Sequence, residues 1–150
     1  MARRVIAACG GSVEEKKIGI LGIAFKPGTD DVREAPSLVV VPMLQEAGAQ
    51  VAAYDPAARE QAEKHLKDVD WKDDPYGVAE GAHALVILTE WNEFRALHLS
   101  QVADSMAEKV LLDFRNIYKP SEMKDKGFHY ISIGRAEVVP DGRDGLKAVS

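Results

Sequence analysis

The stretch from Lys17 to Leu38 constrains the fold more than any other part of the sequence. It begins with an apolar run, residues 18–23, that is interrupted only by Gly19 and Gly22. A run of this length, rich in β-branched residues, indicates a buried strand of a parallel sheet. A charged loop follows, and Pro36 then precedes a helical pattern of apolar residues. Open α/β sheets bind ligands at such places, where a loop joins the carboxyl end of a strand to the next helix.

The charged loop carries two cations, Lys26 and Arg33, that are suited to bind phosphate. The alternative is that both cations are solvated and pair with carboxylates of the same loop. The carboxylates available for this are Asp30, Asp31 and Glu34. Spacing alone leaves both interpretations open.

The loop lacks the G-x-G-x-x-G pattern of a dinucleotide-binding turn, because Gly22 is followed by Ile23, Ala24 and Phe25. Phosphate would therefore have to be held mainly by side chains. Asp55, which follows the second expected strand, could bind an adenosine ribose. The missing glycine pattern disfavours this role, and an Asp-Pro pair after a strand is often only a turn.

The composition is that of one ordinary globular domain of 150 residues. The net charge of -5 argues against nucleic acid or an anionic membrane as the main partner. The single cysteine, Cys9, excludes an internal disulfide and favours a reducing compartment, so we expect a cytoplasmic protein. No apolar run approaches the ~20 residues that a membrane-spanning helix needs.

Strand-like and helical patterns alternate along the chain, as in a parallel sheet covered by helices. We expect an α/β fold, a Rossmann-like three-layer sandwich with a mainly parallel sheet of about six strands. Residues 1–11 would be the end of a longer helix, 12–134 a ligand-binding domain and 135–150 a loosely ordered tail. The expected strands are residues 18–23, 50–54, 69–71, 83–89, 109–113 and 128–133, and the expected helices are residues 1–9, 37–47, 57–66, 75–80, 99–106 and 119–126.

Three loops that follow expected parallel strands should meet at one rim of the sheet. They comprise residues 25–33, 90–94 and 114–116. Arginine can bridge two phosphate oxygens and an aromatic ring can stack on a base, so this rim suits an anionic ligand with a flat ring. The alternative is that Trp91 and Phe94 cap the core, and that Arg115 pairs with Asp113.

The sequence shows neither a metal site nor a nucleophile paired with a base. Its four histidines lack the short spacing of a zinc site, and no histidine near Cys9 in sequence could activate that thiol. We therefore expect no metal and no catalytic residue, and we interpret the chain as a binding domain. The histidines are His65, His83, His98 and His129.

The segment GIAFKPGTDDVREAPS at residues 22–37 closely resembles a motif of the UDP-glucose/GDP-mannose dehydrogenase family. In that family the motif opens the C-terminal nucleotide-sugar-binding domain, and its Thr-Asp-Asp form is most similar to that of bacterial members acting on UDP-glucose. Further points of resemblance are TEWNEF at 89–94, DFRN at 113–116 and SIGR at 132–135. The likeness extends from about Arg3 to Arg135.

Members of this family oxidise the C6 alcohol of the sugar to a carboxylate in two NAD-dependent steps. They join an N-terminal dinucleotide-binding domain to the nucleotide-sugar domain through a long central helix, which also builds a homodimer. The resemblance implies that residues 1–11 are the end of that inter-domain helix and that residues 12–134 are the UDP-binding domain. UDP-glucose and NAD are the implied ligands of the whole protein.

The resemblance also assigns roles to single residues. Phe25 and Lys26 would contact the nucleotide-sugar, with Lys26 near its phosphates or its sugar. Arg115 would bind UDP-glucose at the sugar or the diphosphate, and Trp91 would lie near the nucleotide. Arg33 would reach across the cleft toward NAD.

The family's catalytic cysteine and its NAD-binding glycines are absent from this sequence, and Cys9 does not match the motif of the nucleophile. The chain alone is therefore expected to be inactive. Three alternatives stay open: the same domain with GDP-mannose or a UDP-N-acetylhexosamine as substrate, a stand-alone nucleotide-sensing α/β module, and the dinucleotide-binding domain of an unrelated oxidoreductase.

Overall fold

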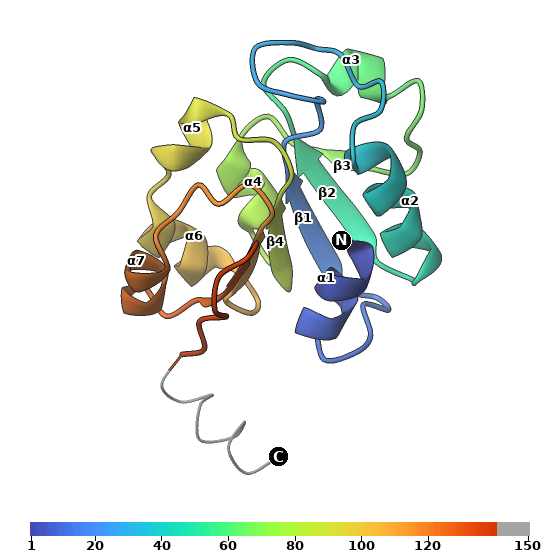
Figure 1. Cartoon of the computed structure of the whole chain (residues 1–150). Helices are drawn as coiled ribbons and strands as arrows, with labels where there is room; N and C mark the ends of the chain where they lie inside the picture. Colours follow the sequence, from blue (N-terminus) through green and yellow to red (C-terminus); the bar gives the residue numbers. More distant parts are fainter. Residues whose placement is uncertain (141–150) are drawn as a thin grey trace.

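Six parallel strands form one sheet in a computed structural model that describes residues 1–140 (Figure 1). Their order, β3-β2-β1-β4-β5-β6, is that of a doubly wound Rossmann sheet, whose connections reverse direction between β1 and β4. The expected fold class and the parallel sheet are thereby confirmed. The strands are β1 (Lys17–Leu21), β2 (Gln50–Tyr54), β3 (Asp70–Trp71), β4 (Ala84–Ile87), β5 (Val110–Asp113) and β6 (His129–Ser132).

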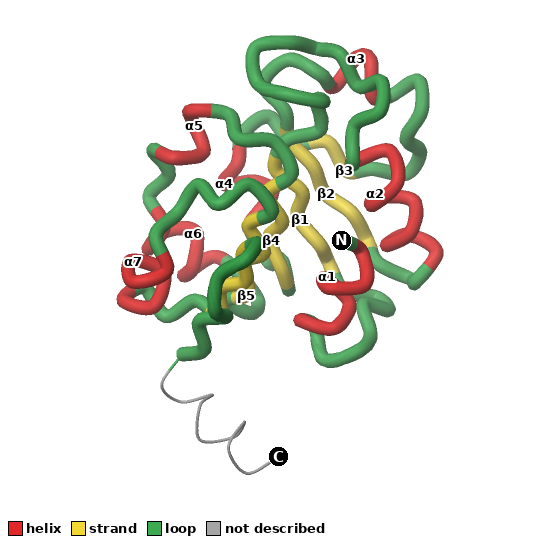
Figure 2. The backbone as a smooth tube through the Cα atoms, in the orientation of Figure 1, coloured by secondary structure: helices red, strands yellow, loops and turns green. Residues whose placement is uncertain are grey.

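Helices cover both faces of the sheet and make the three layers that the sequence predicts (Figures 1 and 2). Alternate residues of a strand point to opposite faces. Ala84 and Val86 accordingly pack with α1 and α2, whereas Leu85 and Ile87 pack with α4, α6 and α7. The helices are α1 (Ala2–Ala8), α2 (Ser37–Glu46), α3 (Arg59–Ala62), α4 (Pro75–Ala79), α5 (Asn92–Arg95), α6 (Leu99–Ser105) and α7 (Pro120–Asp125).

The first helix, α1, completes one of the two helical layers. It contacts α2 and β4, and its Val5 is fully buried in the core on that side. The helix ends at Cys9, where Lys16 Nζ donates to the Cys9 carbonyl at 2.7 Å and Gly10 takes a φ of 85°. A seven-residue helix is marginal alone, so this packing is what stabilises it.

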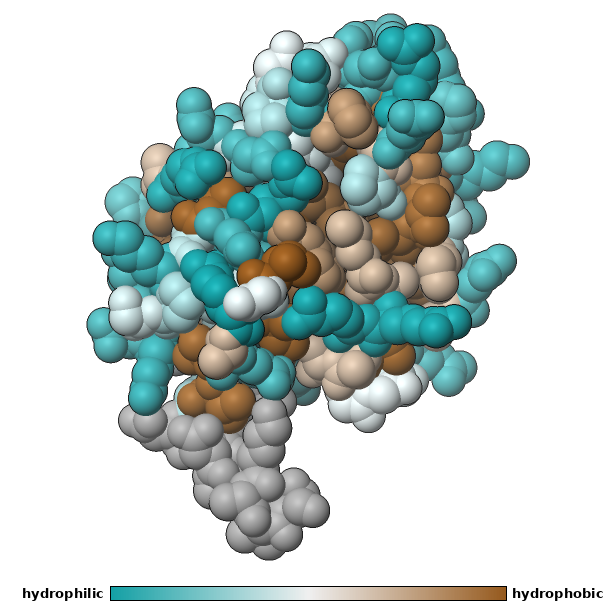
Figure 3. Space-filling view, viewed as in Figure 1, coloured by the Kyte–Doolittle hydropathy of each residue, from teal (hydrophilic) through white to brown (hydrophobic). Residues whose placement is uncertain are grey.

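Hydrophobic surface gathers over α1 and α2 in the space-filling view (Figure 3). Three large apolar side chains are exposed there, Met1, Val39 and Met43. Val39 and Met43 are four residues apart and therefore lie on the same outward face of α2. An exposed apolar patch of this kind is typical of a contact surface.

One expected helix is shorter in the structure, and one short helix was not expected. The helix expected over 57–66 is helical only in the four residues of α3 and continues as turns, with Ala58, Ala62 and Leu66 as its buried side chains. Pro42 lies inside α2, beyond its first turn. The short helix α5, within the TEWNEF segment, was not expected.

The predicted loose tail is wrong for residues 135–138. Arg135 donates from Nε to Ser132 Oγ at 2.9 Å, from Nη1 to the Tyr118 carbonyl at 3.1 Å and from Nη2 to Tyr130 Oη at 2.7 Å. Val138 also forms an antiparallel bridge with Tyr130. These contacts hold the segment against the edge strand β6, and residues 141–150 lie outside the described part of the chain. No helix within residues 1–140 is long and apolar enough to cross a membrane.

The residues that follow β1 and β4 pack closely against each other where the connections of the sheet reverse. Gly22 follows β1 with a φ of +91°, and a Cβ atom placed on it would lie 2.5 Å from Thr89 Cβ and 2.6 Å from Thr89 N. The Thr89 hydroxyl, itself buried, donates to the Ala24 carbonyl at 2.6 Å. Gly22 is therefore required both for its backbone conformation and for the close approach of Thr89.

We expect Gly22→Ala to lower the free energy of unfolding by roughly 2–5 kcal/mol, because backbone strain and overpacking add together. Gly28→Ala is the matched control, since Gly28 also has a positive φ, +81°, but has no atom within 4 Å of the added Cβ. This control should cost only about 1–2 kcal/mol. Urea denaturation of both variants measures the difference, and equal losses would contradict the packing argument.

Candidate functional site

The candidate site lies at the carboxyl rim of three adjacent strands, β1, β4 and β5. The loops that follow them contain residues 25–33, 90–94 and 114–116, as the sequence predicts. Because these strands are parallel neighbours, the three loops begin at the same edge of the sheet (Figure 2). The rim is thus assembled from distant parts of the sequence.

Asp55 fastens this rim together from the end of β2, where it is only 6% exposed. Its Oδ2 accepts the backbone N–H groups of Ile23 and Ala24 at 2.7 and 2.8 Å. The same oxygen accepts the indole N–H of Trp91 at 3.1 Å. Its Oδ1 accepts two N–H groups of the following turn, residues 57–58, both at 2.8 Å. With both oxygens engaged, Asp55 is an anchor of the loops and is not a free acceptor for a ribose.

Trp91 is half-buried, and its contacts support the core-capping role that the sequence left open for it. Its indole packs against the two core clusters, and its Nε1 is bonded to Asp55. The neighbouring Phe94, on α5, is fully buried. The aromatic residues of this loop therefore cap the core, and Trp91 alone of the two reaches the surface of the rim.

The guanidinium of Arg115 pairs with Glu90 and not with Asp113. Nε and Nη2 of Arg115 lie 2.6 and 2.5 Å from Glu90 Oε2. The backbone N–H of Arg115 does reach Asp113, donating to Oδ1 at 3.0 Å. Sequence reasoning missed Glu90, although an acidic residue directly after a buried strand and before a tryptophan was a usable signal.

Asp113 fixes the loop that carries Arg115. It is fully buried, and its Oδ2 accepts the N–H groups of Ile117 and Tyr118 at 2.8 and 3.1 Å and the Tyr130 hydroxyl at 2.6 Å. Burial, together with the hydrogen bond to this carboxylate, raises the pKa of Tyr130 well above its usual range. Because the buried Asp113 carboxylate is shielded from solvent, these hydrogen bonds are what stabilises it, and they hold the loop in one conformation.

The DFRN and SIGR segments interlock through Asn116. Its Nδ2 donates to the Ile133 carbonyl at 3.0 Å and its Oδ1 accepts the Ile133 N–H at 2.9 Å. Asn116 also has a φ of 55°, a conformation that asparagine tolerates better than most residues. These two segments are therefore mainly structural, with Arg115 as the side chain that they present.

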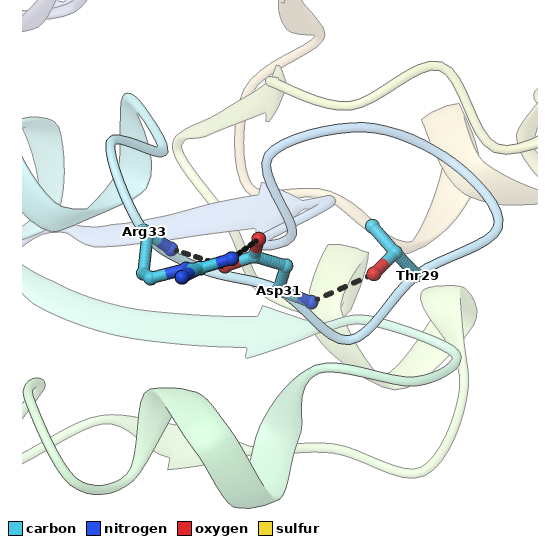
Figure 4. A network of polar contacts seen from close by, with 3 residues as sticks. All are labelled: Thr29, Asp31 and Arg33. Atoms are coloured by element: carbon cyan, nitrogen blue, oxygen red, sulfur yellow. Dashed lines mark hydrogen bonds and ion pairs between the residues drawn. The ribbon is translucent and has the colours of Figure 1, made fainter.

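Arg33 forms a bidentate ion pair with Asp31 in the loop after β1 (Figure 4). Its Nε and Nη2 donate to the two carboxylate oxygens of Asp31 at 3.0 and 2.9 Å, and its backbone N–H donates to Oδ1 at 2.9 Å. The Asp31 N–H in turn donates to Thr29 Oγ1 at 3.1 Å. Pairing within the loop is thus present, yet the Arg33 side chain stays 86% exposed.

A cleft of about 510 Å³ separates this loop from the region of α3. It is lined by residues 29–33 together with Gln61 and His65. Arg33 therefore faces the side of the rim near β2 and α3, whereas Arg115 follows β5. The structure does not bring these two predicted cations together.

Phe25 and Lys26 stand out from the rim toward solvent. Phe25 is 48% exposed, and its backbone N–H donates to the Asp31 carbonyl at 2.8 Å. Within residues 1–140, no carboxylate forms an ion pair with Lys26. Of the predicted phosphate ligands, Lys26 is thus the one whose charge is not already paired.

The described residues contain no group of three or more side chains able to hold a metal ion. Cys9, the sole cysteine, is buried, and burial raises the pKa of its thiol. A buried thiol with a raised pKa is a poor nucleophile. The Cys9 thiol therefore lacks the exposure and the low pKa of a reactive cysteine.

Comparison with known proteins gives two consistent similarities of sequence. The family model described as "UDP-glucose/GDP-mannose dehydrogenase family, UDP binding domain" matches residues 19–120. A UDP-glucose 6-dehydrogenase from Rhizobium meliloti (strain 1021) is 50% identical over 137 residues, which are 91% of this chain and 31% of that protein.

Two solved structures extend the comparison to the fold. A UDP-glucose dehydrogenase from Pyrobaculum islandicum is 32% identical, with a TM-score of 0.70 over 89% of this chain and 28% of its own. An NDP-N-acetyl-D-galactosaminuronic acid dehydrogenase from Methanosarcina mazei Go1 is 30% identical, with a TM-score of 0.76 over 87% of this chain and 28% of its own. The chain thus spans 28–31% of the length of these relatives.

The stabilisation by the Asp31–Arg33 pair depends on pH. The hydrogen bonds and charge of Arg33 lower the pKa of Asp31 from 3.8 to about 2, with a smaller contribution from Lys26. Since the pKa is lower in the folded protein, the stabilisation by this pair is complete above pH 3.8 and is lost as the pH falls toward 2.

We expect the Asp31 carboxylate to stay ionised at about pH 3 in the unaltered protein and to be more protonated there in Arg33→Gln, which loses the side-chain hydrogen bonds and the charge but keeps the backbone N–H. The carboxyl ¹³C chemical shift, followed by NMR against pH, measures this. Lys26→Gln is the control and should raise the pKa of Asp31 much less. An Asp31 titration that is unchanged in Arg33→Gln would show that the pair does not persist in solution.

Proposed function

Because this chain belongs to the UDP-glucose/GDP-mannose dehydrogenase family, we propose that it is the nucleotide-sugar-binding domain of a UDP-glucose 6-dehydrogenase. The UDP-binding description of the matching family model supports the ligand. Relatives at 50%, 43% and 42% identity are each named UDP-glucose 6-dehydrogenase. These names favour UDP-glucose over an N-acetylhexosamine nucleotide.

The observation that carries the proposal is the rim itself. Phe25, Lys26 and Arg115 lie on loops that follow β1 and β5, on the two sides of β4, and all three side chains reach solvent. Lys26 and Arg115 would bind the diphosphate, and Phe25 would cover the base or the sugar. Trp91, whose indole N–H is already bonded to Asp55, would contribute only the exposed part of its ring.

NAD is proposed to be held mainly by a part of the full-length protein that this chain does not include. The residues here do not fit a dinucleotide site: the loop after β1 lacks the glycine pattern, and both oxygens of Asp55 are engaged. Arg33 would face NAD from the far side of the cleft, a role supported by its exposure and by its place in a cleft that Arg115 does not line. The full-length protein would be a homodimer.

The reaction proposed for the whole enzyme is the two-step oxidation of the sugar C6 alcohol to a carboxylate, for which NAD accepts the hydrides. The part of this chain is to fix the nucleotide so that the sugar lies where the other domain acts. Anchoring the substrate at its diphosphate, away from the reacting carbon, places that carbon without taking part in the chemistry.

We expect calorimetric titration of the chain to show binding of UDP and UDP-glucose, and weaker or no binding of GDP and NAD. Arg115→Ala should weaken UDP binding about 10- to 100-fold, because it removes a charge-assisted contact to phosphate. Arg3→Ala is the charge-matched control, since Arg3 is exposed on α1 outside the rim loops. Absence of UDP binding, or tighter binding of GDP or NAD, would contradict the proposed ligand.

A second expectation concerns activity. The purified chain, given UDP-glucose and NAD, should form no NADH, because its only thiol is buried with a raised pKa. NADH absorbance measures this, with a full-length UDP-glucose 6-dehydrogenase as the positive control. Steady NADH formation that is lost in Arg115→Ala would show that this chain holds a complete active site.

A further inference from the structure

The side chains of Glu90 and Arg115 form an ion pair between the loops that follow the neighbouring strands β4 and β5. Glu90 comes shortly after β4 and Arg115 shortly after β5, and Ile87 pairs with Asp113 in the register of these strands. A single carboxylate oxygen, Glu90 Oε2, contacts both Nε and Nη2 of the guanidinium, at 2.6 and 2.5 Å. The pair is partly sheltered, with side chains that are 24% and 41% exposed.

This contact uses only one edge of the guanidinium. A guanidinium has five N–H donors in one plane, and the contact with Glu90 uses Nε and one side of Nη2. No residue within 1–140 accepts a hydrogen bond from Nη1 of Arg115. The edge formed by Nη1 and Nη2 is therefore available, and it presents two parallel N–H groups of the kind that bind a phosphate through two oxygens.

The backbone on both sides of the pair is fixed. Glu90 lies between Thr89, whose hydroxyl is bonded to the Ala24 carbonyl, and Trp91, whose indole is bonded to Asp55. The backbone N–H of Arg115 is bonded to the buried Asp113. A flexible arginine side chain normally loses rotamer freedom when it binds, and a carboxylate that already holds it removes part of that cost.

We propose that Glu90 is a positioning residue, which holds Arg115 with its Nη1–Nη2 edge turned outward to receive the diphosphate of a nucleotide. This inference rests on the proposed function and deepens it. Glu90 touches the arginine and not the ligand. Its negative charge also lowers the net charge of the pair, so that the site selects its ligand by the geometry of two N–H groups more than by attraction alone.

The opposite role for Glu90 is that of a competitor, which occupies Arg115 until a ligand displaces it. In that case, the carboxylate would cover the same edge of the guanidinium that the phosphate needs. Glu90 instead covers the Nε–Nη2 edge with one oxygen and leaves the outer edge uncovered. The two roles predict opposite effects of removing the charge: weaker binding if Glu90 positions Arg115, and tighter binding if it competes.

The test compares Glu90→Gln with Glu46→Gln, which removes the same charge from the exposed last residue of α2. We expect Glu90→Gln to weaken UDP binding about 5- to 20-fold, to leave uridine binding unchanged and to leave the urea midpoint almost unchanged, because a partly exposed pair adds little stability. Glu90→Asp, which keeps the charge, should recover part of the affinity. Glu46→Gln should change none of these measurements.

A second readout follows the pair directly. The Nε–H signal of Arg115 in ¹⁵N NMR, assigned by its loss in Arg115→Lys, should be sharp in the unaltered protein and should persist when UDP is added. In Glu90→Gln it should broaden or move to the position of a solvated arginine. Either change in this signal without a change in affinity would show that the pair forms but does not serve binding, which overturns the proposal.

The outcomes separate this inference from the proposed function. If the unaltered chain binds UDP and Glu90→Gln binds it equally or more tightly, Glu90 is not a positioning residue and the inference is wrong. If the unaltered chain binds no nucleotide at all, the proposed function fails, and the role of Glu90 toward a diphosphate fails with it. Diphosphate-specific weakening together with the loss of the Nε–H signal would support the inference.

Discussion

Two buried carboxylates, Asp55 and Asp113, hold the rim on which the functional side chains lie. They follow or end β2 and β5, which are the middle strands of the two halves of the sheet. Each accepts backbone N–H groups of the loop that comes next and one aromatic side chain from elsewhere, Trp91 for Asp55 and Tyr130 for Asp113. Because a buried carboxylate is costly unless its oxygens are fully hydrogen-bonded, each one forces several loops into a single arrangement.

The rim that results is preorganised and not strongly positive. Arg33 is paired with Asp31 and Arg115 with Glu90, so only Lys26 brings an unpaired charge among the predicted ligands within the described residues. This agrees with a chain whose net charge is -5. The proposed recognition of an anion would use donors that are already in place, because moving them into place would consume part of the binding free energy.

The fold could be predicted from the sequence because its signals are local. A strand buried on both faces must be apolar along its length, and β4 and β5 are buried at every residue. Such runs separated by helical segments leave little choice but a parallel, helix-covered sheet. The boundaries of α3 were less predictable, because the buried side chains of Ala58, Ala62 and Leu66 keep a helical spacing beyond both of its ends.

The partners of the site residues could not be predicted, because they depend on strand register and on loops far apart in sequence. Asp113, two residues before Arg115, was the natural partner by proximity, yet the side chain of Arg115 pairs with Glu90, 25 residues away. The anchoring role of Asp55 likewise has no local sign beyond an Asp-Pro turn. Arg135 belongs to a segment without strand or helix periodicity, and its contacts with Tyr118 and Tyr130 help to hold that segment in place.

The separation of Arg33 from Arg115 limits what a single ligand can do. Arg33 lies on the loop after β1, beside a cleft that this loop lines together with the region of α3, while Arg115 follows β5, and β4 lies between those two strands. Two strand spacings amount to roughly 10 Å. Each guanidinium is also held by its own carboxylate, Arg33 by Asp31 and Arg115 by Glu90. This arrangement favours contacts with two parts of an extended ligand or with two different ligands. The second case would suit the proposed domain, which would face a nucleotide-sugar on one side and a dinucleotide on the other.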